Sequence, residues 1–164
     1  MTEPDEFWES IDAFASKLNA SPETCFVIKN GTAVTGYLIT LPCTKDTLPA
    51  LNSDRFSVPE DADTLYVHDL AMKPESVGKG EATKLVQHAL NKAAEMGLTE
   101  ACLIAVQSSS GYWSRFGFKV VDDLSPEFKA KLSSYGEDAV FMGMKIEQAA
   151  PDISLENETF EPRS

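Results

Sequence analysis

The chain has 164 residues, which fits a single globular domain, and 43% of them are apolar, which can supply one hydrophobic core. Its 26 acidic and 14 basic residues give a formal net charge of −12, which argues against a nucleic-acid partner because phosphate binding requires a basic surface. The acidic surface would attract cationic ligands such as amines, although solubility alone explains it equally well.

Cysteine usage and hydropathy indicate a soluble, intracellular protein of the cytoplasm. Cys25, Cys43 and Cys102 do not form a disulfide framework, and we expect free thiols in a reducing compartment. The acidic N-terminus lacks the apolar segment of a signal peptide, and no apolar run approaches the ~20 residues of a membrane span. We therefore expect no membrane partner. Exposed sheet edges make a homodimer as compatible with the sequence as a monomer.

The first predicted elements are a helix and a hairpin. Residues 4–18 carry apolar side chains at the i, i+3, i+4 spacing of an amphipathic helix. Residues 25–29 and 33–41 are predicted strands, and they flank the Asn30-Gly31 pair, which is typical of tight hairpin turns. We expect Pro42 to end the second strand.

A strand, a glycine-bearing loop and a helix form the centre of the chain. They follow a long connection, residues 42–63, in which we expect one helical turn near residues 48–51. Residues 65–72 have the apolar, β-branched and aromatic composition of a strand, and the loop is residues 77–82. Gly97 ends the predicted helix. The buried stripe of that helix should consist of Ala82, Leu85, Val86, Ala89, Leu90 and Ala93.

The loop between this strand and helix has two interpretations. A helix N-terminus presents backbone N–H groups without partners and the positive end of the dipole, and glycines let a bulky anion approach them. The loop is therefore either a phosphate or pyrophosphate cradle or a plain connection. It is not a P-loop, because no glycine lies five residues before Gly78, and Thr83 excludes a G-x-G-x-x-G fingerprint.

The second half continues the alternation of strands and helices. The apolar run at 101–107 is typical of a strand buried on both faces, and with the preceding strand and helix it forms a right-handed βαβ unit. The further predicted elements are a helix at 108–116, a strand at 118–122, a loop with a possible helical turn at 125–137, and a strand at 139–146.

Two motifs together resemble the GNAT superfamily of acyl-CoA-dependent N-acyltransferases. Gly80 and Ala82 match the last two positions of its cofactor loop, R/Q-x-x-G-x-G/A, after a strand that ends in Met72-Lys73-Pro74. Residues 112–118, YWSRFGF, match its later F-Y-x-x-x-G-F helix. The resemblance covers residues 25–146 and implies an α/β (α+β) fold. That fold is a mixed, mostly antiparallel twisted sheet with a central β-α-β acyl-CoA unit and splayed parallel strands.

The domain boundaries and three departures qualify this resemblance. We expect one domain over residues 1–147 and an acidic tail over 148–164. Val77 replaces the Arg or Gln of the loop, and Trp113 replaces the tyrosine that often serves as general acid. The family's first strand has no equivalent before the first helix, so it is either missing or replaced by residues 153–160 of the tail.

The resemblance implies a slot for the pantetheine arm between two strands that a β-bulge forces apart. Backbone groups near Leu70 and Met72 would bind the arm, and the Met72 N–H would stabilise charge on the thioester oxygen. The residues implied to bind acetyl-CoA, with no metal, are Leu70, Ala71, Met72, Val77, Gly78, Lys79, Gly80, Glu81, Ala82, Thr83, Gln107, Ser108, Tyr112 and Trp113.

Five residues are candidates for proton transfer or acceptor binding. His68 is the first candidate for general base, since it lies on the slot-forming strand, on the face that strict alternation shares with Leu70 and Met72. Asp69 would hold a cationic amine, and Tyr66 would line the pocket; the alternative is a His–Asp pair that only satisfies the sheet.

Tyr112 is the candidate general acid for the leaving thiolate, or else a core aromatic. Tyr135, with two acids after it, stands where the family often builds its acceptor pocket, but a solvated acidic turn is the more common structure for such a segment. The resemblance thus implies an acetyltransferase, a GNAT-type N-acetyltransferase that moves the acetyl group of acetyl-CoA to a primary amine of a small molecule, amino acid or peptide. The alternatives are a non-catalytic acyl-CoA-binding homologue and a scaffold protein without a cofactor.

Overall fold

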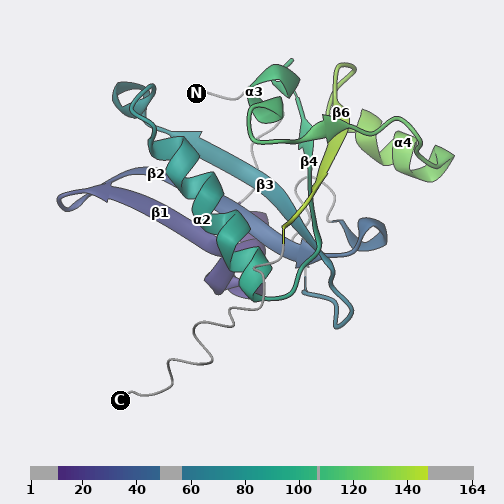
Figure 1. Ribbon diagram of the computed structural model, residues 1–164, viewed down its shortest axis with the longest axis horizontal. Helices are drawn as coiled ribbons and strands as arrows, with labels where there is room; N and C mark the ends of the chain where they lie inside the picture. The colour runs from purple at the N-terminus through teal and green to yellow at the C-terminus, as the bar shows by residue number, and fades with distance from the viewer. Residues whose placement is uncertain (1–10, 49–56, 107, 148–164) are drawn as a thin grey trace.

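The computed structural model describes residues 11–48, 57–106 and 108–147. Its centre is a six-stranded sheet of order β1-β2-β3-β4-β6-β5, mostly antiparallel with one parallel pair (Figure 1). The strands are β1 Cys25–Asn30, β2 Ala33–Cys43, β3 Thr64–Met72, β4 Glu100–Ala105, β5 Lys119–Val120 and β6 Val140–Lys145. The helices are α1 Ile11–Ala20, α2 Glu81–Glu95, α3 Ser110–Ser114 and α4 Pro126–Ser133, with 3₁₀ turns at Pro22–Thr24, Lys45–Thr47 and Pro74–Ser76. The predicted fold class is confirmed.

The β1–β2 hairpin forms as predicted, with one difference at its end. Gly31 adopts a φ of +67°, the left-handed conformation that a tight turn demands, and Asn30 pairs with Ala33. Pro42 does not end β2, which runs on to Cys43. The reason is that β1 pairs with β2 only as far as Ile39, so the missing N–H of Pro42 interrupts no β1–β2 ladder.

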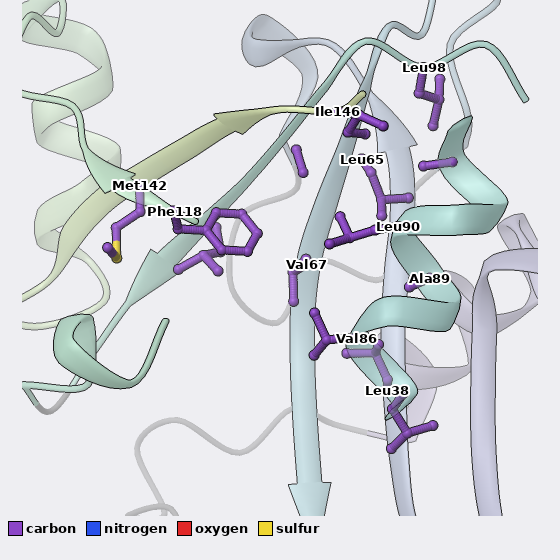
Figure 2. Packing of buried hydrophobic residues seen from close by; sticks show 14 of the residues in the cluster. Leu38, Leu65, Val67, Val86, Ala89, Leu90, Leu98, Phe118, Met142 and Ile146 are labelled. Carbon is purple, nitrogen blue, oxygen red and sulfur yellow. The ribbon is translucent and has the colours of Figure 1, made fainter. Parts of the chain in front are cut away.

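The helix α2 covers one face of the sheet because its apolar stripe matches the side chains beneath it. The predicted stripe is confirmed for Leu85, Val86, Ala89, Leu90 and Ala93, all of which are buried. Figure 2 shows Val86, Ala89 and Leu90 of this stripe pointing toward side chains from β2 and β3, which include Leu38, Leu65 and Val67. This packing fixes where the N-terminus of α2 lies relative to β3.

The opposite face of the sheet is covered partly by α4, where only a possible helical turn was expected. Ser125 caps this helix, since its hydroxyl oxygen accepts a hydrogen bond from the Phe128 N–H at 3.1 Å. Phe128 then packs edge-on against Phe141 of β6, with ring centroids 4.7 Å apart. The contact adds burial that the weak amphipathic pattern of the segment does not reveal.

The strands β3 and β4 begin as neighbours and then separate. They pair in parallel from Thr64 with Glu100 to Val67 with Leu103, and the pairing stops there although β3 continues to Met72. Figure 1 shows β3 and β4 diverging beyond this point, with α3 near the far end of β4. The predicted parallel βαβ unit and its splay are therefore confirmed.

A β-bulge coincides with the separation. Ile39 of β2 pairs with Asp69 while the next residue, Thr40, pairs with Val67, so His68 is an extra residue in β3. An extra residue reverses the alternation of side chains that follow it. Leu70 and Met72 accordingly pack toward the α2 side together with Val67.

Several predictions concern residues outside the described ranges. The first residues of the N-terminal helix, most of the turn near 48–51 and the whole tail after 147 belong to this group. The described part of the first helix is Ile11–Ala20, which contacts β2. The domain boundary at residue 147 and the replacement of a strand by residues 153–160 stay predictions.

Buried hydroxyls join the start of the hairpin to β2. The Thr24 hydroxyl donates to the Thr40 carbonyl at 2.6 Å and lies 2.7 Å from the Ser21 hydroxyl, and all three residues are buried. We expect Thr24→Val to lower the free energy of unfolding by about 1–2 kcal/mol, because it removes a donor from buried acceptors. Chemical denaturation measures this change. Ser133→Ala is the control, because it removes an exposed hydroxyl that donates to the Ala130 carbonyl. A Ser133→Ala effect as large as that of Thr24→Val would contradict the prediction.

Candidate active site

A cavity of about 730 Å³ opens where β3 and β4 separate. Its walls are the second half of β3, the loop before α2, the first turn of α2, the end of β4 and α3. The lining residues are Val67, His68, Asp69, Leu70, Met72, Ser76, Val77, Gly78, Gly80, Ala82, Thr83, Leu103, Ile104, Val106, Ser109, Tyr112, Trp113 and Arg115.

One end of the cavity is the glycine loop. Gly78 and Gly80 have φ angles of +87° and +79°, and a Cβ built on either would meet no atom within 4 Å, so the loop faces open space. Gly80 is also the N-cap of α2 and supplies no side chain to cap it, so the first hydrogen bond within the helix is Lys84 N–H to the Gly80 carbonyl at 3.2 Å. The N–H groups of the first turn are thus available to an anion at this end.

The middle of the cavity is the open edge of β3. The Lys73 N–H donates to the Thr35 carbonyl of β2 at 2.8 Å, so that residue faces β2. Since backbone groups in a strand alternate between its two edges, those of Leu70 and Met72 face the other way, toward the gap that β4 leaves. This is the orientation that the predicted roles of Leu70 and Met72 require.

A glycine on β2 makes room for one cavity wall. Gly36 pairs with Met72, and a Cβ at position 36 would lie 2.3 Å from the Met72 sulfur and 3.0 Å from the Ala71 carbonyl oxygen. Any larger residue at position 36 would therefore force the Met72 side chain out of its place. Gly36 has no obvious motif around it, so the sequence does not reveal this role.

The other end of the cavity holds His68 and Asp69. Asp69 accepts a hydrogen bond of 2.9 Å from the Tyr37 hydroxyl, which comes from the neighbouring strand β2. The rings of His68 and Tyr66 are 5.7 Å apart, and both residues share one side of β3. The expectation that His68 shares its face with Leu70 and Met72 is wrong, because the bulge at His68 reverses the alternation after it.

The helix α3 provides the wall opposite the loop. Trp113 contacts Phe116 and Phe118, with ring centroids 5.8 and 6.0 Å away, and this fixes its orientation in the cavity wall. Burial raises the pKa of the Tyr112 phenol, an effect that the nearby Arg115 partly opposes. Tyr112 therefore stays protonated at neutral pH and can act as a proton donor.

Two predicted acceptor residues do not line the cavity. Tyr66 and Tyr135 are 1% and 5% exposed, and their hydroxyl oxygens are 3.4 Å apart. Burial raises the pKa of Tyr66 well above its ordinary value, with a further contribution from Tyr135. Tyr66 belongs to the hydrophobic layer on the α4 side, and this position favours packing over contact with a ligand.

The structure brings most of the other predicted site residues together. The three predicted catalytic residues, His68, Met72 and Tyr112, all line the cavity, as does Asp69. Of the predicted cofactor residues, Gln107 lies outside the described residues. Those that are described but not among the lining residues are Ala71, Lys79, Glu81 and Ser108.

Several residues of the cavity wall and one hydrogen-bond partner of Asp69 were not predicted from the sequence. Val67, Ser76, Leu103, Ile104, Val106 and Ser109 complete the walls. Arg115 also lines the cavity and was not predicted as a site residue, although its place in the YWSRFGF segment is a signal that could have found it. The Tyr37–Asp69 hydrogen bond could not be predicted from the sequence, because the two residues are 32 positions apart and are brought together only by strand pairing.

Comparison with protein families now identifies the chain. The model of the GNAT acetyltransferase family matches residues 1–118. The chain belongs to the GNAT family. A search of curated protein sequences gives no match.

Solved structures agree with the GNAT fold. The chain is similar to the loading GNATL domain of CurA from Lyngbya majuscula, with a TM-score of 0.67, 12% identity, and coverage of 88% of this chain and 87% of that one. It is similar to a chain of the NatC complex bound to Gag peptide and CoA, with a TM-score of 0.62, 18% identity, and coverage of 90% and 84%. The PaiA N-acetyltransferase from Thermoplasma acidophilum, in complex with coenzyme A, gives a TM-score of 0.54, 16% identity, and coverage of 80% and 69%.

Two features are absent from the part of this GNAT protein that the structure describes. No group of three or more His, Cys, Asp or Glu side chains is placed to hold a metal ion there. None of the described helices is long and apolar enough to cross a membrane.

Proposed function

We propose that this GNAT protein is an N-acetyltransferase that moves the acetyl group of acetyl-CoA directly to a primary amine of a small molecule, amino acid or peptide. The observation that carries the proposal is one continuous cavity. It connects an uncapped helix N-terminus, the open edge of β3 and a pair of titratable side chains. An anion site, a slot for an extended chain and a proton acceptor are the three features that such a transfer needs.

The residues present fit acyl-CoA. Backbone N–H groups of the loop and first turn, from Gly78 to Thr83, would hold the pyrophosphate, and the Thr83 hydroxyl adds a donor. The backbone of Leu70 and Met72 faces the gap, where it would bind the pantetheine amides, and Trp113 would pack against the arm. Acyl-CoA supplies an activated acyl group, and CoA-bound structures of the NatC complex and PaiA support its use here.

The transfer requires a change in the protonation of two groups. The acceptor amine arrives as an ammonium ion and must lose a proton before its nitrogen forms a bond to the acyl carbon. The carbon–sulfur bond then breaks and the thiolate takes up a proton from Tyr112, while the second proton that the amine nitrogen loses returns Tyr112 to its phenol form and the first leaves His68 for solvent. In this scheme His68 accepts the first proton, the Met72 N–H stabilises the negative charge on the thioester oxygen, and Tyr112 protonates the sulfur.

The acceptor end of the cavity suits a cation. Asp69 presents a carboxylate whose position is fixed by the Tyr37 hydroxyl at 2.9 Å. The net charge of −12 adds a favourable potential for an ammonium group. We therefore place the acceptor amine next to Asp69, with His68 beside it at the bulge.

A panel of primary amines tests the function. Purified protein is incubated with acetyl-CoA and each amine, and release of the free CoA thiol is followed together with the mass of the product. We expect turnover with at least one amine. The mass of that amine should increase by about 42 units, the mass that one acetyl group adds, as direct transfer requires. Tight CoA binding without turnover of any amine would favour the non-catalytic homologue. No binding at all would reject both.

The hydrogen bond between Tyr37 and Asp69 gives a further prediction. We expect Tyr37→Phe to raise the KM for the amine about tenfold with little change in the KM for acetyl-CoA, because one charge-assisted hydrogen bond that positions Asp69 is lost. Steady-state kinetics with each substrate varied in turn measures this. A change confined to acetyl-CoA would contradict the role of Asp69 at the acceptor end.

A further inference from the structure

The proposed binding of acyl-CoA raises a problem of charge. The diphosphate of the ligand is dianionic, and the protein carries a net charge of −12. In the family's loop an Arg or Gln often stands where this chain has Val77, which is 62% exposed and carries no charge. Glu81 in the first turn of α2 adds a negative charge. The helix dipole alone provides only about half an elementary charge.

One cationic side chain lies in the opposite wall of the same cavity. Among the described residues that line the cavity, Arg115 is the only Lys or Arg. Lys73, Lys79 and Lys84 are exposed and lie near the loop in sequence, but none lines the cavity. The cavity therefore has a fixed positive charge on the α3 side and none on the loop side.

Arg115 is positioned for a ligand and is not committed to a protein anion. Its Cζ atom lies 5.4 Å from the centre of the Tyr112 ring, a cation–π contact that restrains the side chain. It forms no ion pair with another described residue, and it is exposed. A planar guanidinium binds phosphate oxygens in a bidentate manner, which a lysine does not.

We propose that Arg115 binds the pyrophosphate of acyl-CoA from the α3 side and replaces the cationic residue that the loop lacks at Val77. This inference rests on the proposed function. The loop N–H groups hold one side of the diphosphate, and the guanidinium neutralises the other. The cofactor is then clamped between the two walls of the gap rather than held by the loop alone.

Calorimetric titration of the full chain with three ligands tests this assignment. CoA, dephospho-CoA and pantetheine share the arm but differ in phosphates, since dephospho-CoA lacks the 3′-phosphate and pantetheine lacks every phosphate. We expect Arg115→Gln to lower the affinity for CoA and for dephospho-CoA by about tenfold each and to leave the affinity for pantetheine unchanged. The difference in CoA affinity between wild type and this variant should become smaller at high salt, because salt screens the charge of the guanidinium.

Two further variants complete the design. Arg115→Lys should recover part of the affinity, because it keeps the charge but loses the bidentate geometry. Lys119→Gln removes an equal charge from an exposed position outside the cavity and should bind all three ligands like wild type.

Three results would overturn the inference. The first is equal CoA affinity in Arg115→Gln and wild type. The second is a loss of affinity for CoA in Arg115→Gln without a loss of affinity for dephospho-CoA. The third is a loss of CoA affinity in Lys119→Gln as large as that in Arg115→Gln. Absence of CoA binding by the wild-type chain would instead reject the proposed function itself, so the two failures are distinguishable.

Discussion

Gly80→Ala is expected to weaken acetyl-CoA binding by about 100-fold. Gly80 occupies the N-cap position of α2 with a φ of +79°, and a Cβ added there enters the open space at the loop end of the cavity. The methyl group would hold the diphosphate away from the N–H groups of the first turn. Loss of one or two charge-assisted hydrogen bonds, at roughly 1.5–3 kcal/mol each, accounts for the factor. Calorimetric titration with acetyl-CoA measures it.

The opposite end of α2 offers a matched control. Gly97 has a φ of +82°, and a Cβ there would also meet no atom within 4 Å, but it lies outside the cavity. Both alanine variants should lose about 1 kcal/mol of stability from the left-handed backbone, as seen by thermal unfolding. Only Gly80→Ala should lose affinity. Equal affinities in the two variants would show that the diphosphate does not bind at this helix end.

His68→Gln is expected to lower kcat/KM for the amine by about 100-fold, the lower limit of what a general base usually contributes. His68 lies at the bulge where β3 and β4 separate, and it lines the cavity. Glutamine keeps a polar side chain of similar reach but cannot accept the proton. Steady-state kinetics with the amine varied at saturating acetyl-CoA measures this loss.

The second histidine of the chain serves as the control. His88 is exposed on α2, with its ring 4.7 Å from that of Phe26, and it does not line the cavity. His88→Gln should keep the kcat/KM of wild type. If His68→Gln kept the wild-type kcat while Asp69→Asn lost it, Asp69 would be the base instead.

Local signals in the sequence predict most of the sheet and its main helix. The Asn30-Gly31 turn, the apolar strand before the loop and the stripe of α2 each depend on neighbours within a few residues, so their patterns are readable. The α4 helix is different, because its stability depends on Phe128 meeting Phe141 across the sheet face. Tertiary packing of that kind leaves little trace in a short window of sequence.

The site shows the same division between local and distant information. The glycines of the loop and the YWSRFGF helix are local motifs, and the structure puts both in the walls of one cavity. The faces of β3 were predicted wrongly beyond His68, because one extra residue reverses every later side chain and no local pattern marks it. Tyr37 and Gly36 act through strand pairing, which only the register reveals.

The central claim is that CoA binds with its diphosphate at the start of α2 and its arm along the open edge of β3. Backbone amide chemical shifts of the isotopically labelled chain, recorded during titration with CoA, test it most directly. The account predicts the largest shifts at the amides of Gly78, Gly80 and Ala82, with a second group at Leu70 and Met72. Saturating CoA that moves other amides and leaves these five unchanged would contradict it.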